Sequence, residues 1–166
     1  MIDKATVARK LSESYSRTMA NMDGNVNHGM VSAWLKIPGQ KKMIWGRAYR
    51  DPKTDMWTHG ERSCIENALR ELFGQNIKGR KLPIGCEMIV TLEPCTMPMD
   101  KRRGCSCSDL IKFHGIKSVY CGAEDPKHFD KYGNPPNHPF DLIMTEDKGA
   151  LKKCVHLRSF IPGLND

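Results

Sequence analysis

The sequence lacks long apolar runs. No stretch approaches the roughly 20 consecutive apolar residues that a membrane helix requires, and the N-terminus has no apolar signal core. Low-complexity tracts and internal repeats are also missing. These absences argue against a membrane-spanning, exported or repeat protein. We expect a single domain over residues 1–166 that stays in the cytoplasm and does not bind membranes.

Acidic residues are few relative to basic ones. The chain has 19 Asp and Glu against 26 Lys and Arg, a formal net charge of +7 that should attract phosphate groups. Three basic residues, Lys101, Arg102 and Arg103, are consecutive and lie between two cysteines of interest, Cys95 and Cys107. They predict either contact with a phosphate-bearing substrate or a solvated loop tip that keeps the protein soluble.

The seven cysteines do not suggest a disulfide framework, because their number is odd and no export signal accompanies them. Thiols and metal ligation are the better interpretation. Four of the cysteines fall within apolar helical or strand patterns, where a cysteine behaves as a small hydrophobic residue: Cys64, Cys86, Cys121 and Cys154. We expect these four to pack in the core.

Apolar periodicity predicts an α/β chain of five strands and four helices. The first helix follows the capping residue Asp3 and ends near Asn21. The final helix carries Leu151, Val155 and Phe160. Between them we expect strands at 31–37, 43–49, 86–92, 118–122 and 140–144, and helices at 60–74 and 107–114.

The strongest functional motif combines His59-Gly60-Glu61 with Pro94-Cys95 and a later cysteine. Zinc binds imidazole and thiolate readily, and three protein ligands leave its fourth tetrahedral position open for water. His59 and Cys95 are therefore predicted ligands. Cys107 and Cys105 compete as the third, because the interval after Cys95 is longer than the two residues of the zinc deaminase pattern.

Glu61 is separated from the predicted ligand His59 by one residue, Gly60, and its carboxylate could carry a proton to and from the reacting groups. The alternative is a closed structural zinc site made by His59, Cys95, Cys105 and Cys107. That alternative gives no reason for a carboxylate beside His59, and structural sites usually bring cysteines in close C-x-x-C pairs.

Three further side chains are candidates for substrate contact. Trp57, just before His59, could stack on a base, although it could equally cover the hydrophobic core. His128 lies in a proline-containing loop expected at 125–139, as does His138, and for both the default is a surface or packing histidine.

The segment Thr91-Leu92-Glu93-Pro94-Cys95 resembles the cytidine deaminase superfamily, with tRNA adenosine deaminases and riboflavin-pathway pyrimidine deaminases as the nearest branches in motif. Gly115-Ile116 and Asp125-Pro126 agree with the riboflavin branch, whose register implies Cys107 rather than Cys105 as the third ligand. Gly60 departs from the family, which usually has Ala or Val there.

The resemblance implies a three-layer αβα cytidine-deaminase-like fold with a central five-stranded mixed sheet and a bound Zn²⁺. It also implies hydrolytic deamination of a nucleobase-like ring by a homo-oligomer. The substrate is expected to be a nucleobase, nucleoside, nucleotide or pyrimidine metabolite. The alternatives are cytosine or adenine within single-stranded RNA or DNA, and a non-catalytic, zinc-stapled nucleic-acid binding module.

Overall fold

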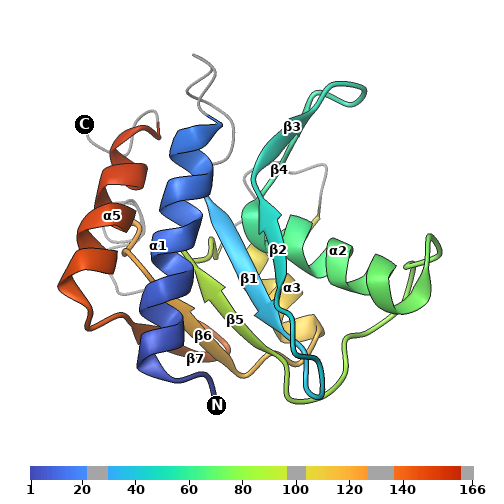
Figure 1. Ribbon diagram of the computed structural model, residues 1–166. Helices are drawn as coiled ribbons and strands as arrows, with labels where there is room; N and C mark the ends of the chain where they lie inside the picture. Colours follow the sequence, from blue (N-terminus) through green and yellow to red (C-terminus); the bar gives the residue numbers. More distant parts are fainter. Residues whose placement is uncertain (22–29, 97–103, 127–136, 162–166) are drawn as a thin grey trace.

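A mixed five-stranded sheet forms the centre of the molecule (Figure 1). The computed structural model describes residues 1–21, 30–96, 104–126 and 137–161. The strand order is β2-β1-β5-β6-β7, with β1 antiparallel to both neighbours and β5, β6 and β7 mutually parallel. The strands are β1 Ser32–Lys36, β2 Ile44–Arg47, β5 Glu87–Val90, β6 Ser118–Cys121 and β7 Asp141–Met144.

Helices cover both faces of this sheet, which confirms the predicted three-layer arrangement (Figure 1). Helices α1 (Lys4–Ala20) and α5 (Lys148–Ser159) pack together on one face. Helices α2 (Gly60–Phe73) and α3 (Cys107–Phe113) cover the other. No helix within the described ranges is long and apolar enough to cross a membrane.

The sheet buries side chains on both faces, as expected for strands sandwiched between helical layers. Along β1, Ala33 and Leu35 belong to the core cluster beneath α2 and α3, whereas Trp34 belongs to the cluster beneath α1 and α5. The predicted core cysteines Cys64, Cys86, Cys121 and Cys154 are all buried, and all seven cysteines are free. The prediction of core packing for these four is confirmed.

Helix α1 begins where the sequence predicts, because the Asp3 side chain accepts a hydrogen bond from the Thr6 backbone N–H. In the sequence, apolar residues of this helix recur every four positions, at Val7, Leu11, Tyr15 and Met19, and this spacing predicts that they share one buried face. Val7 and Leu11 are buried, but Ser14 and Thr18 follow them in place of Tyr15 and Met19. Ser14 is tolerated inside because its hydroxyl accepts a hydrogen bond of 2.9 Å from the Trp34 indole N–H.

The segment after β2 contains a hairpin that the sequence did not reveal. The predicted strand at 43–49 ends at Arg47, and two three-residue strands follow, β3 Tyr49–Asp51 and β4 Met56–Thr58. Asp55 takes a φ of 57° in the turn, a left-handed conformation that aspartate adopts more readily than most residues. The hairpin delivers the chain from Thr58 directly to His59.

Helix α2 lies unusually close to the backbone of the sheet. A Cβ on Gly46 of β2 would lie 2.2 Å from the backbone nitrogen of Cys64. A Cβ on Gly60, the first residue of α2, would lie 2.6 Å from the carbonyl oxygen of Val31. Both contacts are shorter than any side chain allows, so only glycine permits this approach.

The buried face of α5 includes the predicted core residue Cys154 but not all of the large apolar residues of the helix. Ala150, Cys154 and Leu157 are buried, whereas Leu151 and Val155 each keep 37% of their surface exposed. The small residues turn inward because α5 packs closely against α1 and against the chain at the end of β6. The Cys154 sulfur would lie only 2.3 Å from a Cβ on Gly122.

Candidate metal centre

His59 reaches the site from the entrance of α2. It is the N-cap residue of that helix, with extended backbone angles, and its side chain makes no capping hydrogen bond. The imidazole is therefore free to face the adjoining cysteines. Helix α2 then carries Glu61, two positions after His59, in its first turn.

The two cysteines come from the end of a strand and the start of a helix. Cys95 follows β5 after Pro94, which cannot donate to a sheet ladder. Cys107 is the first residue of α3, whose N-terminus is closed by a reciprocal capping box between Ser106 and Asp109. The Ser108 backbone N–H donates to the Cys95 carbonyl at 3.1 Å, which joins the two segments.

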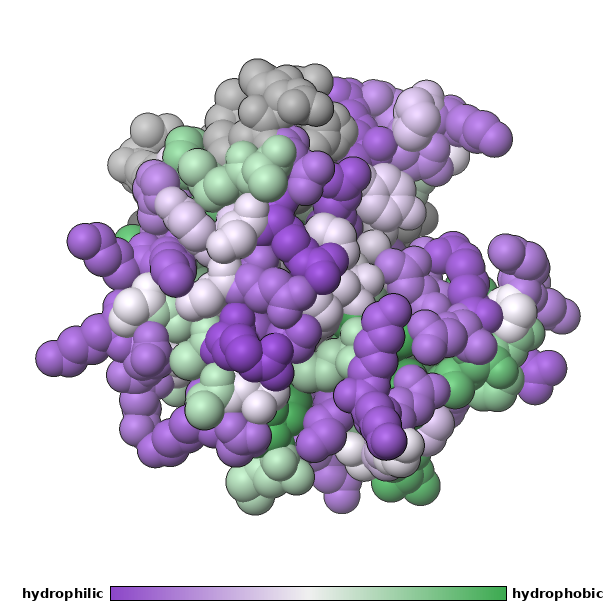
Figure 2. Space-filling model, in the orientation of Figure 1, coloured by the Kyte–Doolittle hydropathy of each residue, from purple (hydrophilic) through white to green (hydrophobic). Residues whose placement is uncertain are grey.

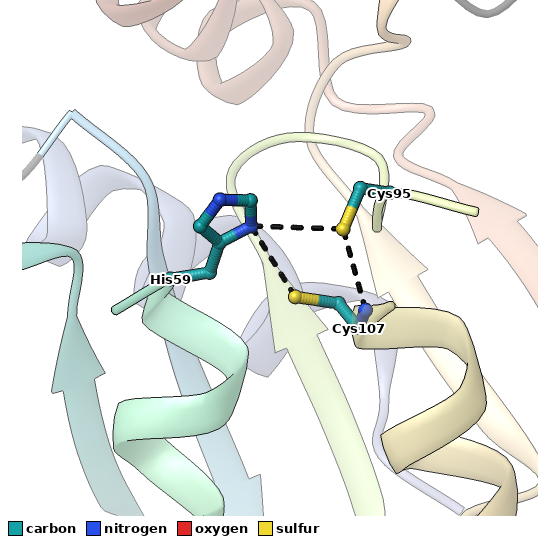
Figure 3. A group of neighbouring side chains, drawn as sticks. All are labelled: His59, Cys95 and Cys107. Atoms are coloured by element: carbon teal, nitrogen blue, oxygen red, sulfur yellow. Dashed lines mark hydrogen bonds between the residues drawn. The ribbon is translucent and has the colours of Figure 1, made fainter. Parts of the chain in front are cut away.

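His59, Cys95 and Cys107 converge on one point (Figure 3). Their ligand atoms lie within 4.8 Å of one another, and His59 Nδ1 is 3.7 Å from Cys95 Sγ and 3.3 Å from Cys107 Sγ. In tetrahedral zinc sites, Zn–S bonds of ~2.3 Å and Zn–N bonds of ~2.0–2.1 Å place nitrogen and sulfur about 3.5 Å apart. The observed separations lie on either side of that value, so the donor set fits zinc.

The protonation of the cysteines also fits a cation. A hydrogen bond from the Cys107 thiol lowers the pKa of Cys95 well below its usual range, with help from His59. The same bond, together with burial, raises the pKa of Cys107. The Cys107 backbone N–H also donates to the Cys95 sulfur at 3.3 Å. The pair thus holds one proton that a divalent cation would displace.

Glu61 is fully enclosed beside this cluster. Its residue exposure is 1%, and its Oε2 atom has no hydrogen-bond partner among the described residues. Burial raises the pKa of Glu61 to about 7, with Cys95 adding to the rise and His59 opposing it. A carboxyl group with a pKa near neutrality can both accept and release a proton under physiological conditions.

Cys105 does not join the cluster of ligand atoms. Cys105 is two residues before Cys107, and its sulfur instead accepts a hydrogen bond of 3.0 Å from the Arg62 guanidinium. Within the described part of the chain, the ligand atoms that lie together are those of His59, Cys95 and Cys107, the set that the register of Gly115-Ile116 favours. The closed four-ligand alternative finds no support in this geometry.

The predicted substrate contacts fall mostly outside the described residues. Lys101, Arg102, Arg103 and His128 lie there, so their predicted roles keep the status of predictions. Trp57 lies on β4 and is half-buried, opposite Arg50 in the β3–β4 pairing.

Sequence reasoning missed one part of the surroundings of the site. Glu93 and His138 form a buried pair at 2.8 Å, and His138 also contacts Ser108 at 3.0 Å. The position of Glu93 immediately before Pro94-Cys95 was the available signal. His138 was predicted only as a surface, packing or substrate-contacting histidine of the 125–139 loop, and its pairing with Glu93 was missed because the two residues are distant in sequence.

Comparisons with known proteins agree with this arrangement. A profile described as the cytidine and deoxycytidylate deaminase zinc-binding region matches residues 7–123. A tRNA-specific adenosine deaminase from Agrobacterium fabrum is 40% identical over 97 residues, which cover 58% of this chain and 53% of the relative. This chain therefore spans about half the length of that relative.

Solved structures show the same fold. A diaminohydroxyphosphoribosylaminopyrimidine deaminase/5-amino-6-(5-phosphoribosylamino)uracil reductase from Thermotoga maritima is 23% identical with a TM-score of 0.50, covering 90% of this chain and 41% of that one. A guanine deaminase from Nitrosomonas europaea is 18% identical with a TM-score of 0.58, covering 92% and 83%. Rib2 deaminase from Aspergillus oryzae is 18% identical with a TM-score of 0.56, covering 95% and 94%.

Proposed function

This chain belongs to the cytidine and deoxycytidylate deaminase family, and we propose that it is a zinc-dependent hydrolytic deaminase. The reaction would replace an exocyclic amine of a nucleobase-like ring with a carbonyl and release ammonia. The observation that carries the proposal is the convergence of His59, Cys95 and Cys107 beside Glu61, whose Oε2 atom is buried without a partner among the described residues.

His59, Cys95 and Cys107 would hold the zinc ion, and Glu61 would move the protons. Bound zinc supplies a Lewis acid that activates water for attack on the ring carbon. Glu61 would accept a proton from that water and deliver it to the departing amine, a role that its pKa of about 7 suits. The buried surroundings exclude competing water and keep the carboxylate beside the reacting groups.

The substrate proposed first is a nucleobase, nucleoside, nucleotide or pyrimidine metabolite. The riboflavin-branch resemblance at Gly115-Ile116 and Asp125-Pro126 supports this choice. Trp57 would then stack on the ring, His128 would contact the substrate, and Lys101, Arg102 and Arg103 would bind a phosphate group. We further propose that the enzyme functions in the cytoplasm, in nucleotide metabolism, as a homo-oligomer.

A base within single-stranded RNA or DNA is the second candidate, because a basic groove runs along α1. The groove has a volume of about 570 Å³ and lies between α1 and the turn from β1 to β2. Hydrophilic side chains are prominent on this face of the molecule (Figure 2). The groove is lined by two acidic side chains, Asp3 and Glu13, and by six basic ones: Arg9, Lys10, Arg17, Lys36, Lys41 and Lys42.

The groove and the metal cluster lie on different layers, because α1 covers the sheet face opposite α2 and α3. A single nucleotide bound at the metal cluster would not also occupy the groove, whereas a longer strand could occupy both. The similarity to a tRNA-specific adenosine deaminase also supports a polynucleotide substrate.

Ammonia release and product mass, measured with zinc-loaded protein, test the proposed function. The substrates are free bases, nucleosides, nucleotides and single-stranded oligonucleotides. Glu61→Gln should abolish turnover while retaining zinc, and Glu71→Gln, an exposed residue of the same helix, should change neither. Turnover by Glu61→Gln at the wild-type rate would refute the role of Glu61. Zinc binding without turnover of any substrate would favour a structural zinc module.

Charge reversal separates the two substrate classes. Lys41→Glu/Lys42→Glu changes the groove, while Lys117→Glu/Lys152→Glu makes the same net change at exposed positions that do not line it. If a polynucleotide is the substrate, the first pair should weaken oligonucleotide binding and reduce its salt dependence far more than the second. Equal effects of the two pairs would reject the groove as the binding surface.

A further inference from the structure

A buried carboxylate–imidazole pair lies next to the metal cluster and has no part in the proposed proton transfer. Glu93 Oε1 and His138 Nε2 are 2.8 Å apart, and their side chains are 3% and 4% exposed. Burying a carboxylate is costly unless hydrogen bonds compensate for the lost water. The partners of this pair therefore indicate what the burial achieves.

Both carboxylate oxygens of Glu93 are used. Oε1 faces His138, and Oε2 accepts a hydrogen bond of 3.0 Å from the Asp125 backbone N–H. The Glu93 backbone N–H in turn donates to the Ala123 carbonyl at 2.9 Å. Glu93, two residues before Cys95, thus fastens the end of β5 to the chain after β6 and to the chain before β7.

The second imidazole nitrogen reaches the other half of the metal cluster. His138 Nδ1 lies 3.0 Å from the hydroxyl of Ser108, the residue after Cys107. The Ser108 hydroxyl also lies 3.4 Å from the Pro94 carbonyl oxygen, to which it can donate. One imidazole therefore connects the strand end that carries Cys95 to the helix start that carries Cys107.

Resting on the proposed zinc site, we propose that Glu93 and His138 are positioning residues that set the separation of Cys95 and Cys107. The two cysteines belong to segments 12 positions apart in sequence, so contacts across the segments must fix their geometry. Stacking of His138 on Phe140, with ring centroids 4.9 Å apart, holds the imidazole plane.

Metal binding tests this proposal without reference to catalysis. His138→Phe keeps the ring and removes both nitrogens, and we expect zinc affinity to fall about 10–100-fold, the range measured when groups supporting metal ligands are lost. The cobalt-substituted protein should show an altered d–d and sulfur-to-metal charge-transfer spectrum. Ser108→Ala, a milder change, should lower zinc affinity about fivefold, as for one lost hydrogen bond.

His114→Phe is the matched control. His114 is also buried and accepts a hydrogen bond from a backbone N–H, that of Leu82, but it lies at the opposite end of α3 from Cys107. The His114→Phe substitution should destabilise the fold without changing zinc affinity or the spectrum of the cobalt-substituted protein. Equal losses of zinc affinity in His138→Phe and His114→Phe would overturn the proposal, as would unchanged metal binding in both His138→Phe and Ser108→Ala.

Conservative rescue provides a second criterion. In Glu93→Gln, the amide oxygen can accept from Asp125 and the amide NH₂ can donate to His138, which then donates to Ser108 from its other nitrogen. Glu93→Gln should therefore bind zinc within a few-fold of wild type, and Glu93→Ala should not. If Glu93→Gln and Glu93→Ala bind zinc equally well, the positioning role is wrong. If the wild type itself binds no zinc, the proposed function fails instead.

Discussion

Replacing Gly60 by alanine tests how closely α2 is fitted to the sheet. The new Cβ would lie 2.6 Å from the Val31 carbonyl oxygen, 2.8 Å from Ser32 Cα and 2.9 Å from the Val31 carbonyl carbon. All three neighbours are backbone atoms, and Val31 O already accepts a hydrogen bond of 2.8 Å from the Ala48 N–H. They cannot move aside as a flexible side chain would.

Relieving the closest contact requires α2 or β1 to move by about 0.8 Å, because ordinary contact begins near 3.4 Å and the Cβ would start at 2.6 Å. Overpacking of this kind typically costs about 1–3 kcal/mol of unfolding free energy. The movement would also displace His59 and Glu61, which flank Gly60. Metal sites tolerate distance errors of only about 0.2 Å, so zinc affinity should fall as well.

Urea unfolding of the metal-free protein and competitive zinc titration measure the two effects. Gly149→Ala serves as the control, because its Cβ would meet only a side-chain oxygen, that of Asp147, at 3.3 Å. It should change stability by less than about 1 kcal/mol and leave zinc affinity unchanged. If Gly60→Ala matches the control in both measurements, the close approach of α2 to β1 is wrong.

Three further predictions concern the metal, the pH dependence and the core. Cys107→Ser should reduce zinc affinity by more than about 100-fold, while Cys105→Ser should retain zinc; metal content after dialysis distinguishes them, and the reverse result would exchange the two cysteines as ligands. Burial, with a contribution from Lys81, lowers the pKa of His114, so the native state binds fewer protons than the unfolded state below about pH 6.5. Unfolding free energy measured by urea should therefore fall as pH drops below that value, and His114→Asn, which keeps an acceptor for the Leu82 N–H, should flatten the loss. Leu11→Ala, at a fully buried site of α1, should lower the free energy of unfolding by about 2–5 kcal/mol, measured by heat or urea. Val155→Ala, on the more exposed face of α5, should lower it by less than about 1 kcal/mol. Similar losses in the two variants would refute the burial assigned to these residues.

The main helices and strands could be predicted because their local signals agree with their packing. Asp3 caps α1, and Gly74 ends α2, both as the sequence indicates. The β3–β4 hairpin could not be predicted, since three-residue strands are too short to show alternation. The inward face of α5 could be predicted only in part: Cys154 was expected in the core, but the small Ala150 is buried there while the larger Leu151 is partly exposed.

The candidate site divides in the same way. His59, Glu61 and Cys95 stand in short motifs whose chemistry can be read locally. The choice between Cys105 and Cys107 needed the register of the resemblance, and the structure places the Cys107 sulfur with the other donor atoms. The contacts of His138 depend on the packing of a distant segment, which no local pattern encodes.

The two glycine contacts beneath α2 affect which amino-acid substitutions this protein can accept near the site. At Gly46 and Gly60, main chain rests on main chain, so these contacts set the closest approach of the helix to the sheet. Substitutions that make neighbouring core side chains smaller cannot then bring the helix that carries His59 and Glu61 any nearer to the sheet at these two points. Laboratory evolution of substrate preference could therefore enlarge the space around the site with smaller side chains, provided that these two glycines are left untouched.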